Sequence, residues 1–449
     1  MQFQLTTDFI ENVEQLIAVK DGNALRELLQ DFHFADVAEL LEELSSDDAT
    51  YLIKLLESDI TSEALMELDD DVREKILDRL SPSEIATELS EMDTDDAADV
   101  VAELDQEVQQ RVIEKIEDQE LAADIVELLA YDEDTAGALM AKELVQVKET
   151  WTVAGCVREM RRQAENVTRV HSIYVTNKEG KLTGRLSLKD LLTAAEKTKI
   201  SEVFIPKVDY VTVHTDNEEV ARIMQKYDLE AIPVVDEDGI LMGRITIDDI
   251  VDFIKDEAEK DYQMAAGISQ DVEADDSVWQ LTRARLPWLV LGLFGGLGSV
   301  YIMQGFEEAL NSFPVLFFFT PLIAAMAGNV GVQSSAIIVQ GLANDNVKGS
   351  LFNRLVKEVG LALINGCALG LLVILFGFIV GQNQLVSVTI AVSMLSVIIV
   401  AALIGTFVPI MLDKRGIDPA IATGPFITTS NDIFGIFLFF YIAKLILGF

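Results

Sequence analysis

The sequence has few of the residues that build disulfide and zinc sites. It contains only two cysteines, Cys156 and Cys367, and three histidines, His33, His171 and His214. The cysteines stand far apart in segments of different character, and the histidines are never paired at helical spacing. We therefore exclude a disulfide framework and a thiolate or imidazole zinc site.

The sequence also lacks a recognisable secretory signal peptide and a recognisable set of catalytic residues. The start, Met1 to Leu5, has no basic segment followed by an apolar stretch, so we expect the first part of the chain to stay on the side of the membrane where it is made. No arrangement of nucleophile, base and oxyanion donors can be recognised, so we expect no enzyme.

Basic residues are scarce, and charge is unevenly distributed. The chain has 34 Lys and Arg against 75 Asp and Glu, a net charge of -41, although 50% of its residues are hydrophobic. From Arg283 to the end the net charge is +1, so residues 1–282 carry -42. Uncharged runs at 286–306, 309–344, 359–412 and 419–431 reach or approach the roughly 20 apolar residues that span a bilayer. The sequence therefore predicts a large acidic cytoplasmic region joined to a multi-pass membrane domain.

The first part of the chain repeats itself. Residues 38–44, followed by an Asp-Asp-Ala triplet at 47–49, return 48 positions later as residues 86–92 and 95–97. Apolar residues recur at helical spacing between the acids. This pattern predicts an all-α acidic helical-repeat domain over residues 1–130, a stack of short helices with a negative outer face.

A second repeat has a different period. Residues 173–187 align with 232–246 at an offset of 59 without a gap, and each copy reads as a two-stranded hairpin turned at a glycine, with a helix on either side. Residues 131–254 thus resemble a tandem pair of cystathionine-β-synthase (CBS) domains, an α/β regulatory module.

The CBS resemblance implies a nucleotide site that the residues themselves leave open. Such pairs commonly bind adenine nucleotides, and the family pattern falls on Ser187, Asp190 and Thr246. A Ser or Thr before a helix also serves as a helix cap, so ATP at this site is one of two interpretations.

Residues 255–285 connect the two parts. Asp248 to Gly267 reads as one long acidic helix. Beyond it, aromatic and basic residues from Trp279 to Trp288 predict a short interfacial helix at headgroup depth.

The transmembrane domain, residues 286–449, is predicted to contain five helices. We place them near 287–306, 313–342, 356–380, 385–411 and 421–448. Basic residues flank the same side of every span, which puts the amino terminus in the cytoplasm and the carboxyl terminus outside, in a plasma (inner) membrane. Five helices leave little room for an internal pathway, so we expect a homodimer with the pathway on its axis.

Asp432 is the one charged residue deep within a span. Such a residue costs at least ~2.5 to 3.5 kcal/mol to insert and by default marks a pathway. Residues 424–432 are predicted to break the helix and to offer carbonyls and hydroxyls, with Gly424, Pro425 and Thr428 lining the pathway. In the second span, Asn329 and Gln333 share one helix face as further lining residues, although the small residues around them are typical of close helix packing.

This ligand set suits a hard cation. One carboxylate per subunit with carbonyl and amide oxygens, and no thiol or imidazole, favours a divalent ion that keeps most of its water, and Mg²⁺ fits best.

The acidic cytoplasmic region predicts a sensor, because a divalent cation would screen the repulsion between its carboxylates. The candidate ligands are carboxylates that share a helix face or lie at a helix start or in the last cytoplasmic loop. They are Asp95, Asp99, Asp216, Glu218, Asp249, Asp252, Glu257, Asp261 and Asp418.

The whole chain resembles the MgtE family of magnesium channels. The resemblance rests on the acidic helical domain, the motif at 131–140, the CBS pair, the connecting helix, and the segment from Asp418 through Pro425 to Asp432. It implies a dimer whose pore binds hydrated Mg²⁺ at Asp432 and which cytoplasmic Mg²⁺ closes. The chain departs from the family pattern at Ala327, Val332 and Gly424.

Two other functions stay open at this point. One is a membrane-bound divalent-cation sensor that does not conduct, and the other is a CBS-regulated carrier of another solute. A sensor would not need a polar fifth span, and an anion path would want basic residues. Expected partners are Mg²⁺, the lipid bilayer and a second copy of the chain, with no nucleic acid.

Overall fold

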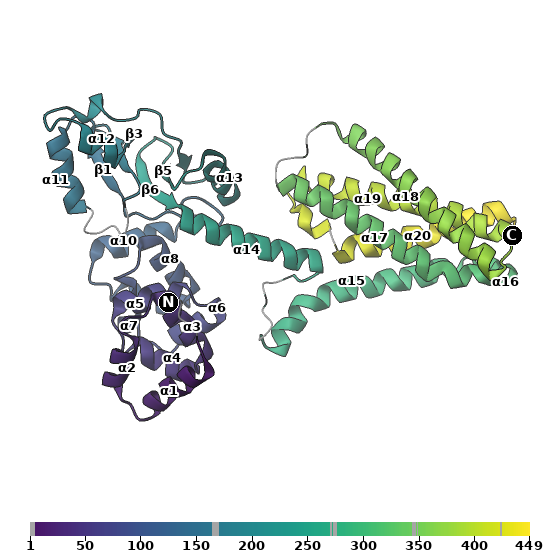
Figure 1. Ribbon diagram of the computed structural model, residues 1–449, viewed down its shortest axis with the longest axis horizontal. Helices are drawn as coiled ribbons and strands as arrows, with labels where there is room; N and C mark the ends of the chain where they lie inside the picture. The colour runs from purple at the N-terminus through teal and green to yellow at the C-terminus, as the bar shows by residue number, and fades with distance from the viewer. Residues whose placement is uncertain are drawn as a thin grey trace. The chain divides into compact units, whose positions relative to one another are not determined.

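The protein divides into two compact units, Met1–Ile254 and Lys255–Phe449 (Figure 1). The computed structural model describes residues 5–163, 170–269, 272, 276–343, 347, 349–422 and 424–449, without the side chain of Leu310. We call the two units unit 1 and unit 2.

Unit 1 starts with a stack of short helices. They are α1 (Thr7–Ala18), α2 (Gly22–Leu29), α3 (Phe34–Glu43), α4 (Ser46–Ile53), α5 (Ser58–Met66), α6 (Asp70–Leu77), α7 (Pro82–Leu89), α8 (Thr94–Glu103), α9 (Gln106–Ile113) and α10 (Gln119–Leu128). Alternate helices pack on one another, α3 on α5, α5 on α7 and α7 on α9. This packing of every second helix is what a helical repeat produces, and it confirms the predicted all-α repeat architecture.

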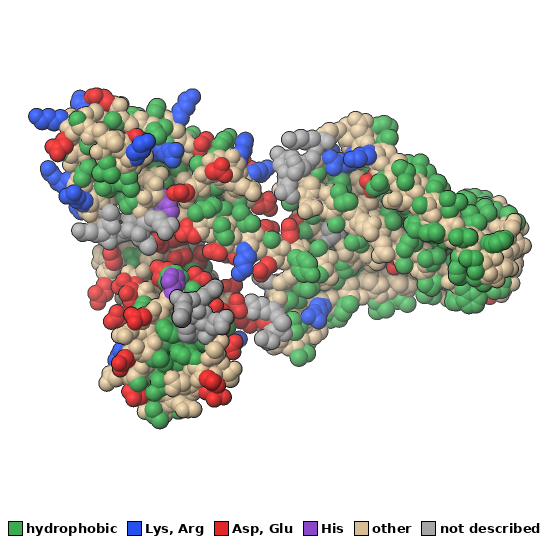
Figure 2. All heavy atoms as spheres, in the orientation of Figure 1, with side chains coloured by type: hydrophobic (Ala, Val, Ile, Leu, Met, Phe, Trp, Pro, Cys, Tyr) green, Lys and Arg blue, Asp and Glu red, His purple; other side chains and the backbone are tan. Residues whose placement is uncertain are grey.

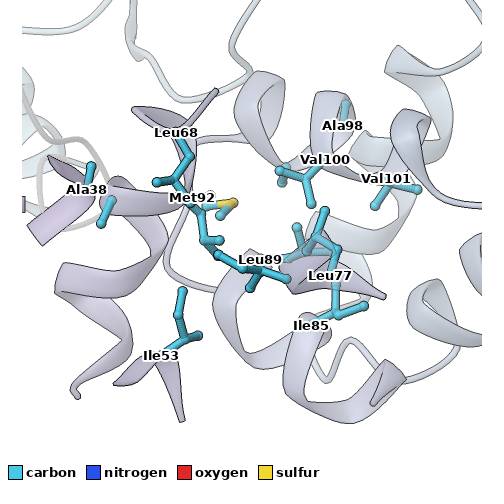
Figure 3. Close-up of a cluster of buried hydrophobic side chains, with 14 of the residues drawn as sticks. Ala38, Ile53, Leu68, Leu77, Ile85, Leu89, Met92, Ala98, Val100 and Val101 are labelled. Atoms are coloured by element: carbon cyan, nitrogen blue, oxygen red, sulfur yellow. The ribbon is translucent and has the colours of Figure 1, made fainter. Parts of the chain in front are cut away.

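Polar caps and apolar stripes explain why these helices form. Ser81, for example, begins α7 with a capping box, in which its side chain and that of Glu84 each accept a backbone N–H of the other residue. Inward-facing leucines, isoleucines and valines from neighbouring helices then meet in one continuous cluster (Figure 3). Burial of this apolar surface, rather than the short helices themselves, holds the stack together.

The sequence repeat has one irregular position. The first copy places Leu40 and Leu41 of α3 in the core, both 0% exposed. The equivalent residues of α7 are Glu88 and Leu89, so a carboxyl group occupies a leucine site. Glu88 is 7% exposed, and the hydroxyl of Thr61 donates a hydrogen bond of 2.6 Å to it.

Two small three-stranded sheets follow. The first contains β1 (Val145–Lys148), β2 (Ile173–Thr176) and β3 (Leu182–Leu186), with helices α11 (Val153–Gln163) and α12 (Leu188–Thr193) and the 3₁₀ turn η2 (Ile200–Glu202). The second contains β4 (Val211–Thr212), β5 (Ala231–Val235) and β6 (Leu241–Thr246), with α13 (Asn217–Tyr227) and α14 (Ile247–Ala266).

The two sheets have the same topology. In each, the first strand pairs in parallel with the second, and the second pairs antiparallel with the third across a hairpin with one irregularity of register. Gly180 and Gly239 turn the hairpins at φ values of 88° and 82°, a conformation that favours glycine. The predicted CBS pair is confirmed.

The two copies differ in where their cores lie. The first copy buries its own apolar cluster, whereas the second shares a continuous core with the helical stack, through residues such as Ala136 and Met140. The helix stack and the second CBS copy are therefore joined by packing. The long helix α14, predicted at 248–267, leaves this copy and continues from unit 1 into unit 2.

Unit 2 consists of long apolar helices. They are α15 (Val278–Gln304), the short α16 (Glu307–Ser312), α17 (Val315–Ala343), α18 (Leu351–Val380), α19 (Gln384–Asp413), the 3₁₀ turn η3 (Pro419–Ala422) and α20 (Gly424–Leu447). Within the described residues, five are long and apolar enough to cross a membrane, which confirms the predicted number of spans. Helix α19 is the most buried and packs against α17, α18 and α20. Hydrophobic side chains form large patches on the face of this unit that Figure 2 shows.

Two details of the predicted membrane domain are wrong. The interfacial helix expected at 279–288 is not separate, because α15 runs unbroken from Val278 through Pro287 to Gln304. The helix break expected at 424–432 is not found there, because α20 is helical from Gly424 to Leu447 and Asp432 sits in regular helix. A proline near a helix start needs no N–H partner, which explains why Pro425 does not interrupt α20.

Candidate functional site

Asp432 lines a cleft of about 410 Å³ in unit 2. Helix α20 contributes Asp432 and Thr428, which stand one helical turn apart. The facing helix, α17, contributes the remaining lining residues. They are Ala324, Ala325, Gly328, Asn329, Val332 and Gln333.

Helical periodicity explains how these side chains meet. Residues four apart lie on one face of a helix, so Asn329 and Gln333 form one polar stripe, and Thr428 and Asp432 form another. Gly328 lets the helices approach, since a Cβ at this position would lie 3.3 Å from the Thr428 methyl group. The structure thus brings four predicted pathway residues to one cleft.

The cleft supplies the ligands of a hard cation. It combines a carboxylate, two amide side chains and a hydroxyl, and in the described chain no Lys or Arg forms an ion pair with Asp432. At about 30 Å³ per water, the six waters of a hydrated Mg²⁺ occupy roughly 180 Å³, which the cleft accommodates. The arrangement suits an ion held through its water shell.

Two residues predicted to line the pathway lie elsewhere. Gly424 and Pro425 are absent from the cleft lining and instead meet the end of α14. A Cβ at Gly424 would lie 2.1 Å from the carbonyl oxygen of Ala265, and one at Gly267 would lie 2.4 Å from Pro425 Cγ. The start of α20 is therefore packed against the end of the connecting helix.

The sequence interpretation missed part of the lining. The small residues of α17 were expected to serve close packing, but the structure splits them between two faces. Ala327 and Gly331 are buried against other helices, whereas Ala325, Gly328 and Val332 line the cleft. Helical spacing could have identified Ala325 and Val332, which lie one turn before and one turn after Asn329.

Three predicted sensor residues gather at the end of α14 in unit 2. Burial raises the pKa of Asp261, and the nearby charges of Asp418 and Glu257 raise it further. Lys260 forms an ion pair of 3.3 Å with Glu257. Because these carboxylates repel one another, a cation between them would be favoured.

A denser carboxylate cluster lies in unit 1 around the start of α8. Ligand oxygens of Asp93, Asp95 and Glu143 lie within 4.8 Å of one another, close enough to share one metal ion. Thr94 donates to Glu143 from its backbone N–H and its hydroxyl, at 3.2 Å and 2.9 Å. These bonds tie the first turn of α8 to the segment that enters the first CBS copy.

The start of α14 faces the same cluster. Burial raises the pKa of Asp96 to about 8, with the charge of Asp249 as the next cause. Burial also raises the pKa of Asp99 to about 6, and Glu103 adds to the effect. The pKa of Asp95 lies well above its ordinary value because of burial and the charges of Asp96 and Asp249.

The structure thus joins three of the predicted sensor residues, Asp95, Asp99 and Asp249, across two elements. Asp252, one turn further along α14, is exposed. Sequence reasoning missed Asp96, although it lies beside Asp95 in the first turn of α8. It also missed Glu143, which only the tertiary fold brings to the cluster.

The pair Asp216 and Glu218 has a structural role. Asp216 is the N-cap of α13 and accepts a hydrogen bond of 2.9 Å from the backbone N–H of Glu218. Both side chains are exposed at the start of this helix. Their assignment as metal ligands stays a prediction.

The residues predicted to bind nucleotide also act as caps. Ser187 begins α12 and donates to Asp190 at 2.7 Å, while the Thr246 hydroxyl donates to Asp249 at 2.6 Å. Asp190 is half-exposed, whereas Thr246 is 6% exposed. Ser187 is also partly exposed, so the first copy leaves its capping hydroxyl more accessible to a ligand than the second does.

Comparisons with known proteins agree with this architecture. The MgtE model, described as a divalent cation transporter, matches residues 320–442, and the MgtE intracellular N domain matches 32–134. The CBS domain matches twice, at 136–197 and 200–256.

Two similar transporters align over more residues than either unit contains, so the similarity includes parts of both units. The magnesium transporter MgtE of Bacillus subtilis is 36% identical over 317 residues, 70% of each chain. That of Thermus thermophilus is 36% identical over 323 residues, 71% of this chain and 72% of its own. Among solved structures, the cytosolic domain of the Mg²⁺ channel MgtE in complex with ATP has a TM-score of 0.52 at 36% identity, covering 54% of this chain and 99% of that one.

Proposed function

The chain belongs to the MgtE family of magnesium transporters, and we propose that it is a homodimeric Mg²⁺ channel that Mg²⁺ itself closes from the cytoplasmic side. Members of this family are transporters, so the chain is not an enzyme. Its five apolar helices make it a multi-pass membrane protein.

The cleft around Asp432 is the observation that carries the proposal. One carboxylate per subunit holds a hydrated divalent ion without trapping it, whereas a denser cluster would bind it too tightly for passage. Asn329, Gln333 and Thr428 offer neutral oxygens to the ion's waters. The cleft lies at the surface of one chain, and a second copy facing it would enclose the ion.

The carboxylate clusters support closure by magnesium. Without a cation, the acids within the cluster around Asp95 repel one another, as do those within the cluster around Asp261, and a divalent ion bound in either cluster turns that repulsion into attraction. Helix α14 carries Asp249 near its start, and the residues at its end pack on Gly424 and Pro425. Ion binding at the clusters is thereby linked to the position of α20, the helix that bears Asp432.

The direct test is Mg²⁺ entry into liposomes that contain the purified protein. We expect Asp432→Ala to abolish entry, and the matched change Asp413→Ala, at an exposed carboxylate at the end of α19, to leave it intact. Mg²⁺ entry that is unchanged in Asp432→Ala would show that the pathway lies elsewhere. If the wild-type protein responds to Mg²⁺ but does not conduct it, the chain is a sensor instead.

We also propose that ATP binds at the CBS pair. A solved relative is the cytosolic domain of the Mg²⁺ channel MgtE in complex with ATP, and in this chain the half-exposed Asp190 can accept hydrogen bonds from ribose hydroxyls. Calorimetry with ATP and the full-length protein tests this. We expect Asp190→Ala to weaken binding and the surface change Asp209→Ala to leave it unchanged.

A further inference from the structure

Asn431 stands directly before Asp432 but points in a different direction. Successive residues of an α-helix are rotated by about 100°, so the two side chains cannot share a face. Asp432 lines the cleft, whereas Asn431 is 1% exposed and packs between α20 and α17. The amide is therefore outside the ion-binding surface.

The Asn431 side chain joins the two helices that form the cleft. Its Nδ2 donates a hydrogen bond of 3.3 Å to the backbone carbonyl of Ala327 on α17. A Cβ at Gly331 would lie 1.8 Å from that nitrogen, so the missing side chain of Gly331 makes the space for the amide. Asn431 thus supplies the donor, Ala327 the acceptor, and Gly331 the space that the amide occupies.

The same contact continues along α20. Ile427 and Gly435, one turn before and after Asn431, also approach α17, the first near Gly331 and the second near Ala327. This stripe is the packing face of α20, and Thr428 and Asp432 form the neighbouring stripe that faces the cleft. A small rotation of α20 about its axis would break the Asn431 bond and turn Asp432 away from Asn329 and Gln333.

Packing alone does not account for an amide at this position. Within the described residues, Oδ1 of Asn431 is buried and has no hydrogen-bond partner. A buried polar atom without a partner is unfavourable, and leucine, of similar size, would avoid that penalty. The benefit of the asparagine therefore lies in the directional bond made by its Nδ2.

We propose that Asn431 is a positioning residue of the ion pathway, whose amide fixes the rotation of α20 against α17 so that Asp432 faces the amides of α17. This inference rests on the proposed function and adds a residue that never touches the ion. It predicts that disturbing the contact from either helix changes how the pathway binds Mg²⁺.

The experiment compares two variants that disturb the contact from opposite sides. Asn431→Leu removes the hydrogen bond, and Gly331→Ala pushes the amide away while keeping it. Matched controls are Asn365→Leu, at an exposed asparagine of α18, and Gly360→Ala, where an added Cβ meets nothing within 4 Å. Full-length proteins are reconstituted in liposomes, and the rate of entry is measured against Mg²⁺ concentration.

We expect both variants to raise the half-saturating Mg²⁺ concentration about threefold or more, the loss associated with one directional hydrogen bond. The controls keep the wild-type value. A purely structural role would instead lower the amount of folded protein and the maximal rate, leaving the half-saturating concentration unchanged, and that result would overturn the inference.

Two further measurements keep the outcome unambiguous. If Asn431→Leu does not fold, as judged by gel filtration, Asn431→Ala removes the amide without adding bulk and carries the same expectation. If the wild-type protein conducts Mg²⁺ and Asp432→Ala does not, the proposed function stands, and an unchanged half-saturating concentration in the Asn431 variants then contradicts this inference alone.

Discussion

Carboxylates are crowded in unit 1 and solitary in the membrane helices of unit 2. Around the start of α8, the pKa values of Asp95, Asp96 and Asp99 are raised by burial and by neighbouring acids. The other residues that line the cleft of Asp432 are uncharged. Crowded carboxylates repel one another, so the stability of the folded cluster depends strongly on a bound cation. An isolated carboxylate binds a cation more weakly, so the ion can leave it. The two arrangements suit sensing and passage, respectively.

The largest expected effect comes from breaking the crowded site. Asp95→Asn combined with Asp249→Asn removes two carboxylates of the cluster, so a cation can no longer bridge α8 and α14. We expect limited proteolysis of the cytoplasmic region to lose its dependence on millimolar Mg²⁺. Asp59→Asn, an exposed acid at the start of α5, is the control. Protection by Mg²⁺ that persists in the double variant would place the sensor elsewhere.

The contact between α14 and α20 provides the next test. Gly424 has a φ of 45°, and a Cβ would meet the Ala265 carbonyl, so Gly424→Ala separates the helices. Gly416→Ala introduces alanine at a similar φ of 66° with nothing within 4 Å. We expect Gly424→Ala to weaken closure by internal Mg²⁺ severalfold in flux assays. Equal behaviour of the two variants would mean that backbone strain, not the helix contact, is responsible.

The pH dependence of unit 1 sharpens the comparison. The pKa of Asp96 is about 8 in the folded state, above the ordinary value near 4. A raised carboxyl pKa means that the folded state keeps its proton longer, so stability is lost as pH rises from about 4 through about 8. We expect unit 1 without Mg²⁺ to be cleaved faster by protease at pH 8.5 than at pH 6, and Mg²⁺ to protect it more at the higher pH. Protection independent of pH would contradict this account.

The smallest effect concerns the irregular repeat position. Burial raises the pKa of Glu88 to about 7, and the hydrogen bond from Thr61 only partly offsets it. Stability is therefore lost as pH rises from about 4.5 through 7. Glu88→Leu restores the residue type found at Leu40 and should stabilise the protein by up to roughly 3 kcal/mol above pH 7. Chemical denaturation measures this, with the exposed Glu91→Leu expected to stay within about 0.5 kcal/mol of wild type.

Local patterns predicted most of the architecture. Uncharged runs located the five spans, a repeat at an offset of 59 located the CBS pair, and helical spacing placed Asn329 and Gln333 together. These signals work because period and hydropathy act over a few turns of helix.

Long-range contacts were not predictable in the same way. Glu143 reaches the α8 cluster only through the tertiary fold, and Gly424 was assigned to the pathway because a glycine and a proline look like a helix break. The structure gives both residues partners far away in sequence, on α8 and on α14. Periodicity within one helix contains no information about such partners.

The most direct measurement compares Asp432→Asn with Asp95→Asn in liposomes loaded with increasing internal Mg²⁺. The account predicts that Asp432→Asn stops Mg²⁺ entry at every internal concentration. It predicts that Asp95→Asn conducts at low internal Mg²⁺ like wild type and closes less completely at high internal Mg²⁺. If Asp432→Asn altered only closure, or Asp95→Asn abolished entry itself, the division between one carboxylate for passage and many for sensing would be contradicted.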